Sequence, residues 1–318
     1  DIDRGGVFAQ LFGTIALLEP DERARVKGTI INKFRGDRTI LEPGLRQLEA
    51  LCGVPVAGVV PYAQVDIDDE DSLSARFTRN TARKLLDVAV IRLPRISNFT
   101  DFSPFERYEN VSVRYVDRVS SIGAPDLILL PGTKSTIADL QWLRESGLEA
   151  AILKEAARGT LIFGVCGGYQ MLGEYYETYD GKRCDFIGAL ELYTVGSKKR
   201  MIGNYEFKCT ENAGGSVVVG FENHSGKTWL GSGIEPLGKI ISGFGNNGED
   251  GTEGAHFKNV FGTYSHGPML PKNPEFCDLL LKTALERKYG AAELQPLDDA
   301  FEKAAHDAMC ARLEAKNK

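Results

Sequence analysis

The chain has 318 residues, of which 42% are hydrophobic and 26% charged, and its formal net charge is -6. These values are ordinary for a globular protein, and the length predicts about two domains. The negative charge gives no electrostatic reason to expect nucleic acid as a partner. No apolar stretch approaches the roughly 18 residues of a spanning helix and no signal peptide is recognisable, so we expect a cytoplasmic protein with no direct membrane span.

The first 80 residues alternate between helical and strand patterns. We predict a helix over residues 4–18, a strand over 26–32, a helix over 43–51 and a strand over 54–60. Residues 66–71 hold five carboxylates, which a metal site or an acidic connector would both explain. A polar and basic stretch follows, so we place the domain boundary there and predict domains over 1–80 and 81–318.

The second predicted domain is of the α/β class. Its apolar runs predict strands over 87–92, 111–115, 127–130 and 161–165, with helices over 136–146 and 148–158 between the last two. This alternation predicts a mostly parallel sheet with helices on both faces.

The pattern changes after residue 188. Short strands and Gly-rich turns follow there, and we expect an antiparallel extension. Residues 243–254 are Gly-, Asn- and Asp-rich and read as too polar to pack, so we predict a mobile loop at the rim. Residues 297–316 read as a charged amphipathic helix.

The motif with the clearest chemistry lies at residues 161–173. An apolar run ends in Gly164, and Cys166 follows between small residues and ahead of Gly167 and Gly168. This pattern is typical of a nucleophile elbow, a strand, sharp turn and helix with the nucleophile at the apex. The helix start favours thiolate over thiol, and the Gly167 N–H is free to bind an oxyanion. A buried structural cysteine is the alternative, but a core strand gains nothing from so many glycines.

A cysteine nucleophile needs a base, and the chain has four histidines. His266 follows an apolar run and precedes Gly-Pro, which places an imidazole at a strand end. His224 lies where a short strand runs into a turn, so it either lines the same cleft or belongs to a surface turn. Six scattered cysteines without a Cys-x-x-Cys pair indicate neither a zinc site nor a disulfide framework, and a working thiol favours a reducing compartment.

Together, the Gly-x-Cys-Gly-Gly-Tyr-Gln-Met-Leu-Gly and Gly-Thr-Tyr-x-His-Gly motifs resemble the class I glutamine amidotransferase domains of the cobyric acid synthase family. The resemblance implies a flavodoxin-like fold in which Cys166 attacks the side-chain amide of glutamine, forms a glutamyl thioester and releases ammonia. It implies that His266 is the general base and that Gln170 helps to hold the substrate. Many class I amidotransferases carry Glu two residues after this His, where this chain has Pro268, so the orienter of His266 is unassigned.

The loop at residues 130–136, Leu-Pro-Gly-Thr-Lys-Ser-Thr, resembles the oxyanion loop of the same family. The resemblance implies that the backbone of Gly132 and Thr133 faces the thioester, together with that of Gly167.

Upstream motifs resemble the synthetase half of the same family. They are Asp-Ile-Asp-Arg-Gly-Gly at residues 1–6, Asn-Lys-Phe-Arg-Gly-Asp at 32–37 and Gly-Val-Val-Pro-Tyr at 58–62. The resemblance places Asp1 and Asp3 near a nucleotide and Mg²⁺, although a solvated turn explains them equally well. The phosphate-binding Gly-x-x-x-x-Gly-Lys-Ser/Thr loop does not occur, so we expect a fragment with a partial P-loop-type synthetase domain, which needs a complete synthetase domain or partner to use ATP and Mg²⁺.

The C-terminal third is more similar to the glutaminase subunit of lipid II isoglutaminyl synthase. The segment Lys-Lys-Arg-Met-Ile-Gly-Asn at residues 198–204 carries part of this resemblance, as do residues 220–228 and 243–254. It implies that Arg200 is tied to glutamine binding, and a guanidinium suits the α-carboxylate because it can bind it bidentately. A solvated basic loop is the alternative for this run of charges.

Three functions are therefore open. The first is a glutaminase that delivers ammonia to carboxylates of a corrinoid in cobalamin biosynthesis, which we favour because this resemblance spans both domains. The second is a glutaminase, without a cofactor of its own, that serves a separate ligase for lipid II in peptidoglycan synthesis. The third is a binding or regulatory module that has lost activity, against which the intact Cys166, Gln170 and His266 argue.

Overall fold

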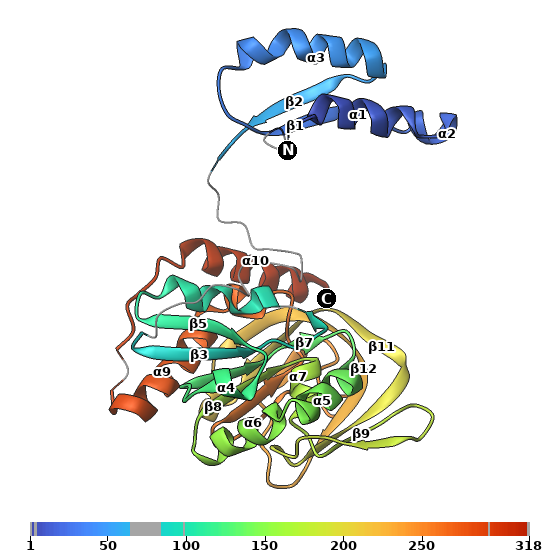
Figure 1. Ribbon diagram of the computed structural model, residues 1–318. Coiled ribbons are helices and arrows are strands. Elements are labelled where there is room, and N and C mark those ends of the chain that lie inside the picture. Colours follow the sequence, from blue (N-terminus) through green and yellow to red (C-terminus); the bar gives the residue numbers. More distant parts are fainter. Residues whose placement is uncertain (1, 3–4, 64–83, 98, 292, 317–318) are drawn as a thin grey trace. The chain divides into compact units, whose positions relative to one another are not determined.

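The computed structural model describes the chain except for residues 1, 3–4, 64–83, 98, 292 and 317–318. The chain divides into two compact units, Asp1–Ile67 and Asp68–Lys318 (Figure 1). The predicted boundary near residue 80, the acidic run at residues 66–71 and the candidate metal ligands Asp1 and Asp3 lie outside the described residues. Among the helices that are described, none is long and apolar enough to cross a membrane.

The smaller unit has a two-stranded parallel sheet and three helices. Its elements are α1 (Val7–Ala16), α2 (Pro20–Arg23), β1 (Thr29–Phe34), α3 (Arg38–Cys52) and β2 (Val56–Pro61). The helix predicted over 43–51 begins five residues earlier because the Asp37 side chain accepts a hydrogen bond from the Thr39 N–H and caps it. Pro43 therefore lies inside α3 rather than at its start.

A six-stranded sheet forms the centre of the larger unit, in the order β15-β16-β8-β6-β3-β5. The strands are β3 (Leu86–Ile91), β5 (Val111–Val116), β6 (Leu127–Leu130), β8 (Leu161–Val165), β15 (Ala255–Phe257) and β16 (Val260–Thr263). Every neighbouring pair is parallel except β15 with β16. The five parallel strands follow the chain in the flavodoxin order 2-1-3-4-5, which confirms the predicted α/β fold.

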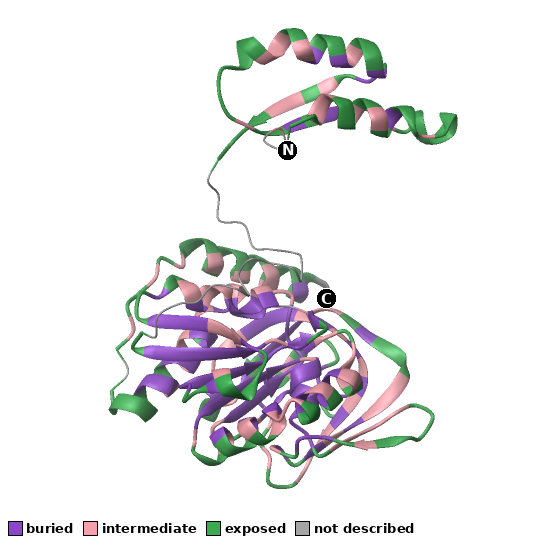
Figure 2. Ribbon diagram, viewed as in Figure 1, coloured by how far each residue is buried: buried purple, intermediate pink, exposed green. Residues whose placement is uncertain are grey.

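Helices cover both faces of this sheet, and its strands are the most buried part of the unit (Figure 2). Successive residues of β3 point to opposite faces of the sheet. Val88 and Val90 therefore pack in one apolar cluster, and Ala89 and Ile91 pack in the other. The helical elements of the first face are η3 (Phe99–Arg107) and α9 (Pro274–Tyr289), and those of the second are α5 (Thr136–Glu145) and α6 (Leu148–Ala157). α9 is an addition to the predicted elements.

The remaining short helices are α4 (Val119–Ile122), α7 (Gly167–Met171) and α8 (Met269–Lys272), and the charged helix near the C-terminus is α10 (Ala300–Lys316). α8 follows His266 within three residues, and α10 contacts it through a hydrogen bond between the His306 ring and the Lys272 carbonyl.

The predicted antiparallel extension is confirmed as a second sheet, although one of its neighbouring strand pairs is parallel. Its elements are β9 (Tyr175–Glu177), β10 (Arg183–Asp185), β11 (Leu192–Cys209), β12 (Val217–Leu230), β13 (Gly238–Ser242) and β14 (Thr252–Glu253). The long strands β11 and β12 pair along most of their length, and the register shifts between Gly196 and Met201. The basic run at residues 198–200 therefore occupies an irregularity of β11.

The interpretation of residues 243–254 as too polar to pack is wrong. Asn246, Asn247 and Glu253 in this segment are essentially fully buried. The side chains of the two asparagines are satisfied internally: the Asn246 amide donates to the Thr252 hydroxyl and the Gly254 carbonyl, and the Asn247 amide donates to the Thr228 carbonyl. Composition alone suggested a solvated loop, but buried polar groups are tolerated when each finds a partner.

Candidate active site

Cys166 sits at the apex of a strained turn between β8 and α7. Its φ and ψ are 50° and -107°, a conformation that non-glycine residues rarely adopt. The flanking glycines are required by close packing. A Cβ on Gly168 would lie 2.0 Å from the Leu130 carbonyl oxygen, and one on Gly164 would lie 2.7 Å from Leu172. The predicted elbow therefore forms, and its backbone presses directly against the end of β6.

The structure brings His266 to the same edge of the sheet. β16 lies beside β8 in parallel, with Thr263 opposite Val165, so both chains leave the sheet at their carboxyl ends. The Cys166 N–H donates to the Thr263 carbonyl at 2.8 Å, three residues before the histidine. His266 itself is 7% exposed and exchanges two backbone hydrogen bonds with Phe221 of β12. His266 is thus held between the end of β16 and the second sheet.

Both groups are electrically neutral at neutral pH. Burial raises the pKa of Cys166 to about 11, although the side chain keeps part of its surface accessible. The adjacent Gly167 N–H lowers this pKa but does not offset burial, so the predicted stabilisation of a resting thiolate is wrong. Burial, with the neighbouring charges of His224 and Lys272, lowers the pKa of His266 to about 4. A neutral imidazole can accept the thiol proton during attack.

In the part of the chain that the structure describes, no side chain forms a hydrogen bond with Nδ1 that would orient the imidazole of His266. Its buried Nδ1 has no hydrogen-bond partner there. Pro268, which stands where other class I enzymes carry Glu, offers no side-chain acceptor and is the N-cap of α8. The imidazole is positioned by its backbone and by the Phe221 ring, whose centroid lies 5.8 Å away in an edge-on arrangement.

The predicted oxyanion loop lies against the elbow. Gly132 and Thr133 form the short strand β7 (Gly132–Thr133), which pairs with β4 (Ile96–Ser97). A Cβ on Gly167 would lie 3.2 Å from the Thr133 nitrogen and 2.8 Å from its methyl carbon. The three residues predicted to stabilise an oxyanion are therefore neighbours, and their role in catalysis stays a prediction.

Gln170 connects three parts of the site. Its amide oxygen accepts a hydrogen bond from the Thr136 hydroxyl at 3.3 Å, and its amide nitrogen donates to the Tyr264 hydroxyl at 3.0 Å. Tyr264 also shares a hydrogen bond with Thr228. Protein groups thus engage both ends of the Gln170 amide, and the predicted contact with substrate glutamine stays a prediction.

Arg200 is exposed, and it lies close enough to Cys166 for its charge to lower the pKa of that thiol. Its Nε donates to the Asn223 side-chain oxygen at 2.5 Å, which fixes the guanidinium across β11 and β12. Asn223 was not among the predicted site residues, although it directly precedes His224 in the motif at residues 220–226.

His224 is buried, so the surface-turn interpretation is wrong. Its ring stacks on Tyr264 with centroids 3.5 Å apart, and its Nδ1 lies 2.8 Å from the Gly226 carbonyl, which requires the proton to be on Nδ1. Tyr264 lies two residues before His266 and contacts both His224 and Gln170. Tyr264 was not among the predicted site residues, although it lies inside the Gly-Thr-Tyr-x-His-Gly motif, which could have identified it.

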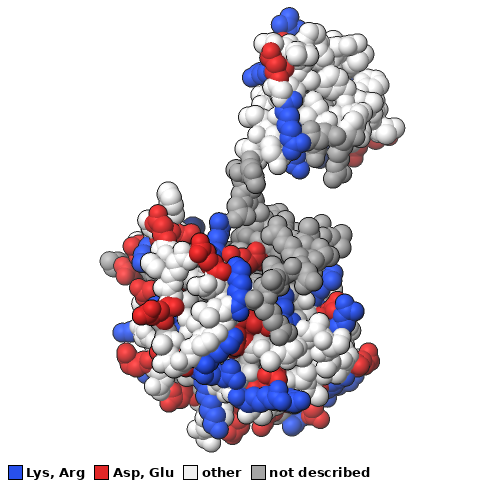
Figure 3. Space-filling view, turned by 60° about the vertical axis from the view of Figure 1, so that its left-hand side comes forward, with Lys and Arg blue, Asp and Glu red and all other residues white. Residues whose placement is uncertain are grey.

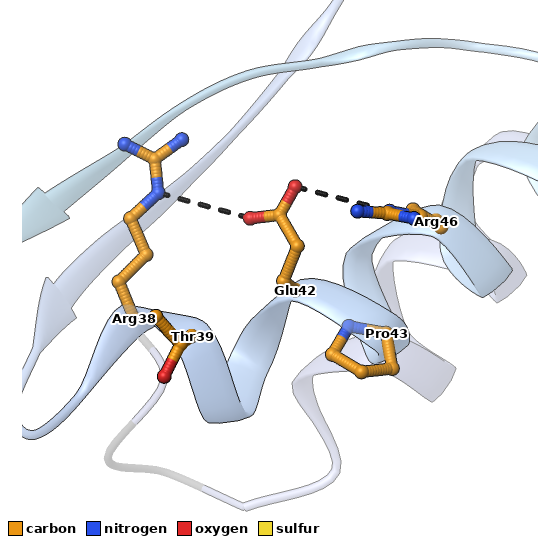
Figure 4. A pocket seen from close by; sticks show the side chains of 5 residues that line it. All are labelled: Arg38, Thr39, Glu42, Pro43 and Arg46. Atoms are coloured by element: carbon orange, nitrogen blue, oxygen red, sulfur yellow. Dashed lines mark ion pairs between the residues drawn. The ribbon is translucent and has the colours of Figure 1, made fainter.

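Two hollows differ in their relation to this site. One belongs to the smaller unit and is lined by α3, where Glu42 lies between Arg38 and Arg46 at 4.0 and 3.9 Å (Figure 4). It contains none of the predicted site residues. The other, of about 310 Å³, is lined by the start of α5, the β9–β10 hairpin, β11 and β12. Thr136, the hydrogen-bond partner of Gln170, lines it, so this hollow opens beside the site.

The surface shown in Figure 3 carries both signs of charge, with Lys and Arg interspersed among Asp and Glu on the larger unit. Among the described residues, no group of three or more His, Cys, Asp or Glu side chains is placed to hold a metal ion. The magnesium role predicted for Asp1 and Asp3 concerns residues outside that part of the chain.

Comparisons with known proteins identify relatives of this chain by sequence. The chain is 48% identical to a cobyric acid synthase of Lachnoclostridium phytofermentans over 91% of this chain and 60% of that protein. It is 48% identical to a cobyric acid synthase of Ruminiclostridium cellulolyticum over 84% and 54%, and 43% identical to one of Yersinia enterocolitica over 92% and 59%. The chain therefore spans no more than about 60% of the length of these curated relatives.

A solved structure described as a glutamine amidotransferase superposes with a TM-score of 0.49 and 18% identity, over 62% of this chain and 98% of that one. A family profile described as the CobB/CobQ-like glutamine amidotransferase domain matches residues 87–274. That range contains β3 to β16 with Cys166 and His266. The chain belongs to the CobB/CobQ-like glutamine amidotransferase domain family.

Proposed function

We propose that this chain hydrolyses glutamine at Cys166 and supplies the ammonia to an activated carboxylate. The observation that carries the proposal is the meeting of a strained Cys166 elbow with the buried, neutral His266 at the ends of two adjacent parallel strands. A nucleophile and a base at the carboxyl edge of an open α/β sheet suit acyl transfer. Membership of a glutamine amidotransferase family supports glutamine as the acyl donor.

The chemistry proceeds through a thioester. The thiol sulfur of Cys166 adds to the amide carbon of glutamine while its proton passes to His266. Backbone N–H groups of Gly132, Thr133 and Gly167 would stabilise the oxyanion. The C–N bond then breaks, and the imidazolium returns its proton to the leaving nitrogen, which departs as ammonia. Water hydrolyses the thioester to glutamate and regenerates the thiol.

For the acceptor we propose peripheral carboxylates of a corrinoid, as in cobalamin biosynthesis. Support comes from the relatives, which are named cobyric acid synthases and match across both units of this chain. Activation of a carboxylate would need ATP and Mg²⁺, and we assign these to a complete synthetase domain or partner. We also propose that the reaction takes place in the cytoplasm, because a working thiol favours a reducing compartment.

The direct test is glutamate release from glutamine by this chain and by its Cys166→Ala variant. We expect release by the parent chain and none by the variant. Release that survives the substitution would exclude Cys166 as the nucleophile. With a complete synthetase domain supplied, amide-¹⁵N glutamine should label a corrinoid carboxamide, and labelling of lipid II instead would contradict the proposed acceptor.

A further inference from the structure

Glu253 is a buried carboxyl group in the segment that connects the two sheets. It ends β14, is fully buried and comes from the Gly- and Asn-rich segment at residues 243–254. Its Oε1 accepts hydrogen bonds from the Thr263 hydroxyl at 2.7 Å and from the Tyr264 N–H at 2.8 Å. Both donors lie where β16 ends.

These two hydrogen bonds act on the backbone that joins nucleophile and base. The Thr263 carbonyl accepts the Cys166 N–H, and His266 follows Tyr264 by two residues. The Tyr264 side chain in turn binds Gln170 and stacks on His224. The Glu253 carboxylate therefore holds the backbone at the end of β16. The positions of both Cys166 and His266 depend on this backbone.

The same segment also holds the elbow helix from the other side. Asn246 accepts a hydrogen bond from the Tyr169 hydroxyl of α7 at 3.0 Å, and its amide donates to the Gly254 carbonyl next to Glu253. The carboxylate of Glu222 binds the Phe244 and Gly245 N–H groups at 2.8 and 2.9 Å and anchors the start of the segment. The segment is thus tied to α7, β12 and β16 together.

We propose that Glu253 is a positioning residue for the Cys166–His266 pair and that its charge tunes the reactivity of the thiol. In a catalytic triad, the third residue is a carboxylate that holds the imidazole directly. Glu253 instead holds the backbone at the end of β16, and this backbone in turn positions the imidazole. This inference rests on the proposed glutaminase function.

Electrostatics supports the geometric argument. Burial is the main cause of the raised pKa of Cys166, and the negative charge of Glu253 raises this pKa further; burial also raises the pKa of Glu253 itself to about 7. The ionisable groups that influence these two, from every element packed around them, are Asp101, Tyr169, Arg200, Tyr205, Cys209, Glu222 and Tyr264. The carboxylate, which is linked to the Cys166 backbone through Thr263, thus becomes charged as the pH rises through neutrality.

The test compares Glu253→Ala, which removes the acceptor, with Glu253→Gln, which keeps an acceptor oxygen and removes the charge. For Glu253→Ala we expect kcat for glutamine hydrolysis to fall about tenfold or more at little-changed KM, since two buried donors lose their partner. Glu253→Gln should recover kcat to within about threefold of the parent, since one oxygen can accept both bonds. Glu155→Gln, at a buried carboxylate of α6 bound to Arg158 and Thr160, is the matched control.

Alkylation of Cys166 by iodoacetamide gives a second measurement that needs no glutamine turnover. Above pH 7 we expect Glu253→Gln to be alkylated at least about twofold faster than the parent, with no difference below pH 6, because only the parent gains the negative charge at residue 253 that raises the pKa of the thiol. Cys166→Ala identifies the signal of that thiol.

Unchanged kcat in Glu253→Ala would overturn the positioning role. The proposal would also be overturned if Glu253→Ala and Glu253→Gln lost kcat equally and the alkylation rate of Cys166 did not change. Glu253 would then have only a structural role. If the parent releases no glutamate, the proposed function fails, while the alkylation profiles of the parent and Glu253→Gln still decide this inference.

Discussion

Substitution of Gly168 by alanine tests whether the elbow is set by backbone packing. The added Cβ would lie 2.0 Å from the Leu130 carbonyl oxygen and 2.7 Å from the Pro131 carbonyl oxygen, where at least 3.0 Å is needed. Both obstacles are backbone atoms, so no side chain can rotate away. α7 and the end of β6 must separate by about 1 Å, and overpacking of this kind costs ~3 kcal/mol.

This destabilisation has two measurable consequences. For a unit of this size, it lowers the melting temperature by roughly 6 to 12 °C. Pro131 leads directly into Gly132 of the oxyanion loop, so the displacement also moves the groups that would bind the oxyanion. A misplacement of about 1 Å in a catalytic site costs about 100-fold in kcat/KM for glutamine hydrolysis.

Thermal unfolding by circular dichroism and a glutamate-release assay measure the two effects. Gly233→Ala is the control, because its Cβ would meet only the carboxylate end of the flexible Glu191 side chain, at 3.3 Å. A Gly168→Ala protein that melts within 2 °C of this control and keeps its activity would refute the packing argument.

Three further predictions follow from the site. Arg200→Met should raise KM for glutamine about tenfold with a smaller effect on kcat, as expected for loss of a charge-assisted contact. The control variant Lys199→Met should change neither KM nor kcat. Equal kinetics of the two variants would contradict the role of Arg200. Burial raises the pKa of Glu253 to about 7 from an ordinary 4.5, so its ionisation costs the folded state up to about 3 kcal/mol as pH rises through that window. Urea unfolding should therefore show Glu253→Gln gaining stability relative to the parent between pH 5 and pH 8, and a constant difference would contradict a raised pKa. Thr136→Val should lower kcat several-fold, because the Gln170 amide oxygen loses its hydrogen-bond donor. An unchanged kcat, together with a crystal structure of the variant in which Gln170 has not moved, would show that this hydrogen bond does not matter for activity.

Much of the central sheet could be predicted from the sequence because its strands are continuous apolar runs. The observed β6 and β8 coincide with the predicted ranges 127–130 and 161–165, and they are buried on both faces, as parallel strands usually are. The elbow could also be predicted, because only small residues fit beside Cys166 and glycine is visible in a sequence. Membership of the amidotransferase family followed from those same motifs.

What escaped prediction depends on tertiary contacts. Residues 243–254 have the composition of a solvated loop, and nothing local shows that Asn246 will meet the Tyr169 hydroxyl or that Glu253 will meet the end of β16. The ionisation of Cys166 was mispredicted for a related reason. The dipole of α7 is a local property, whereas the burial that outweighs it comes from segments distant in sequence.

The placement of Cys166 after the fourth parallel strand and His266 after the fifth has a consequence for biosynthesis. The complete second sheet is inserted between them, so Cys166 emerges from the ribosome 100 residues ahead of His266. Long-range strand pairing of this kind is slow, because loop closure precedes the contacts that stabilise it. β16 can join β8 only after β11 and β12 have been synthesised. A nascent or truncated chain that ends before β16 therefore carries Cys166 without His266, and the two residues come together only when synthesis of this unit is nearly finished.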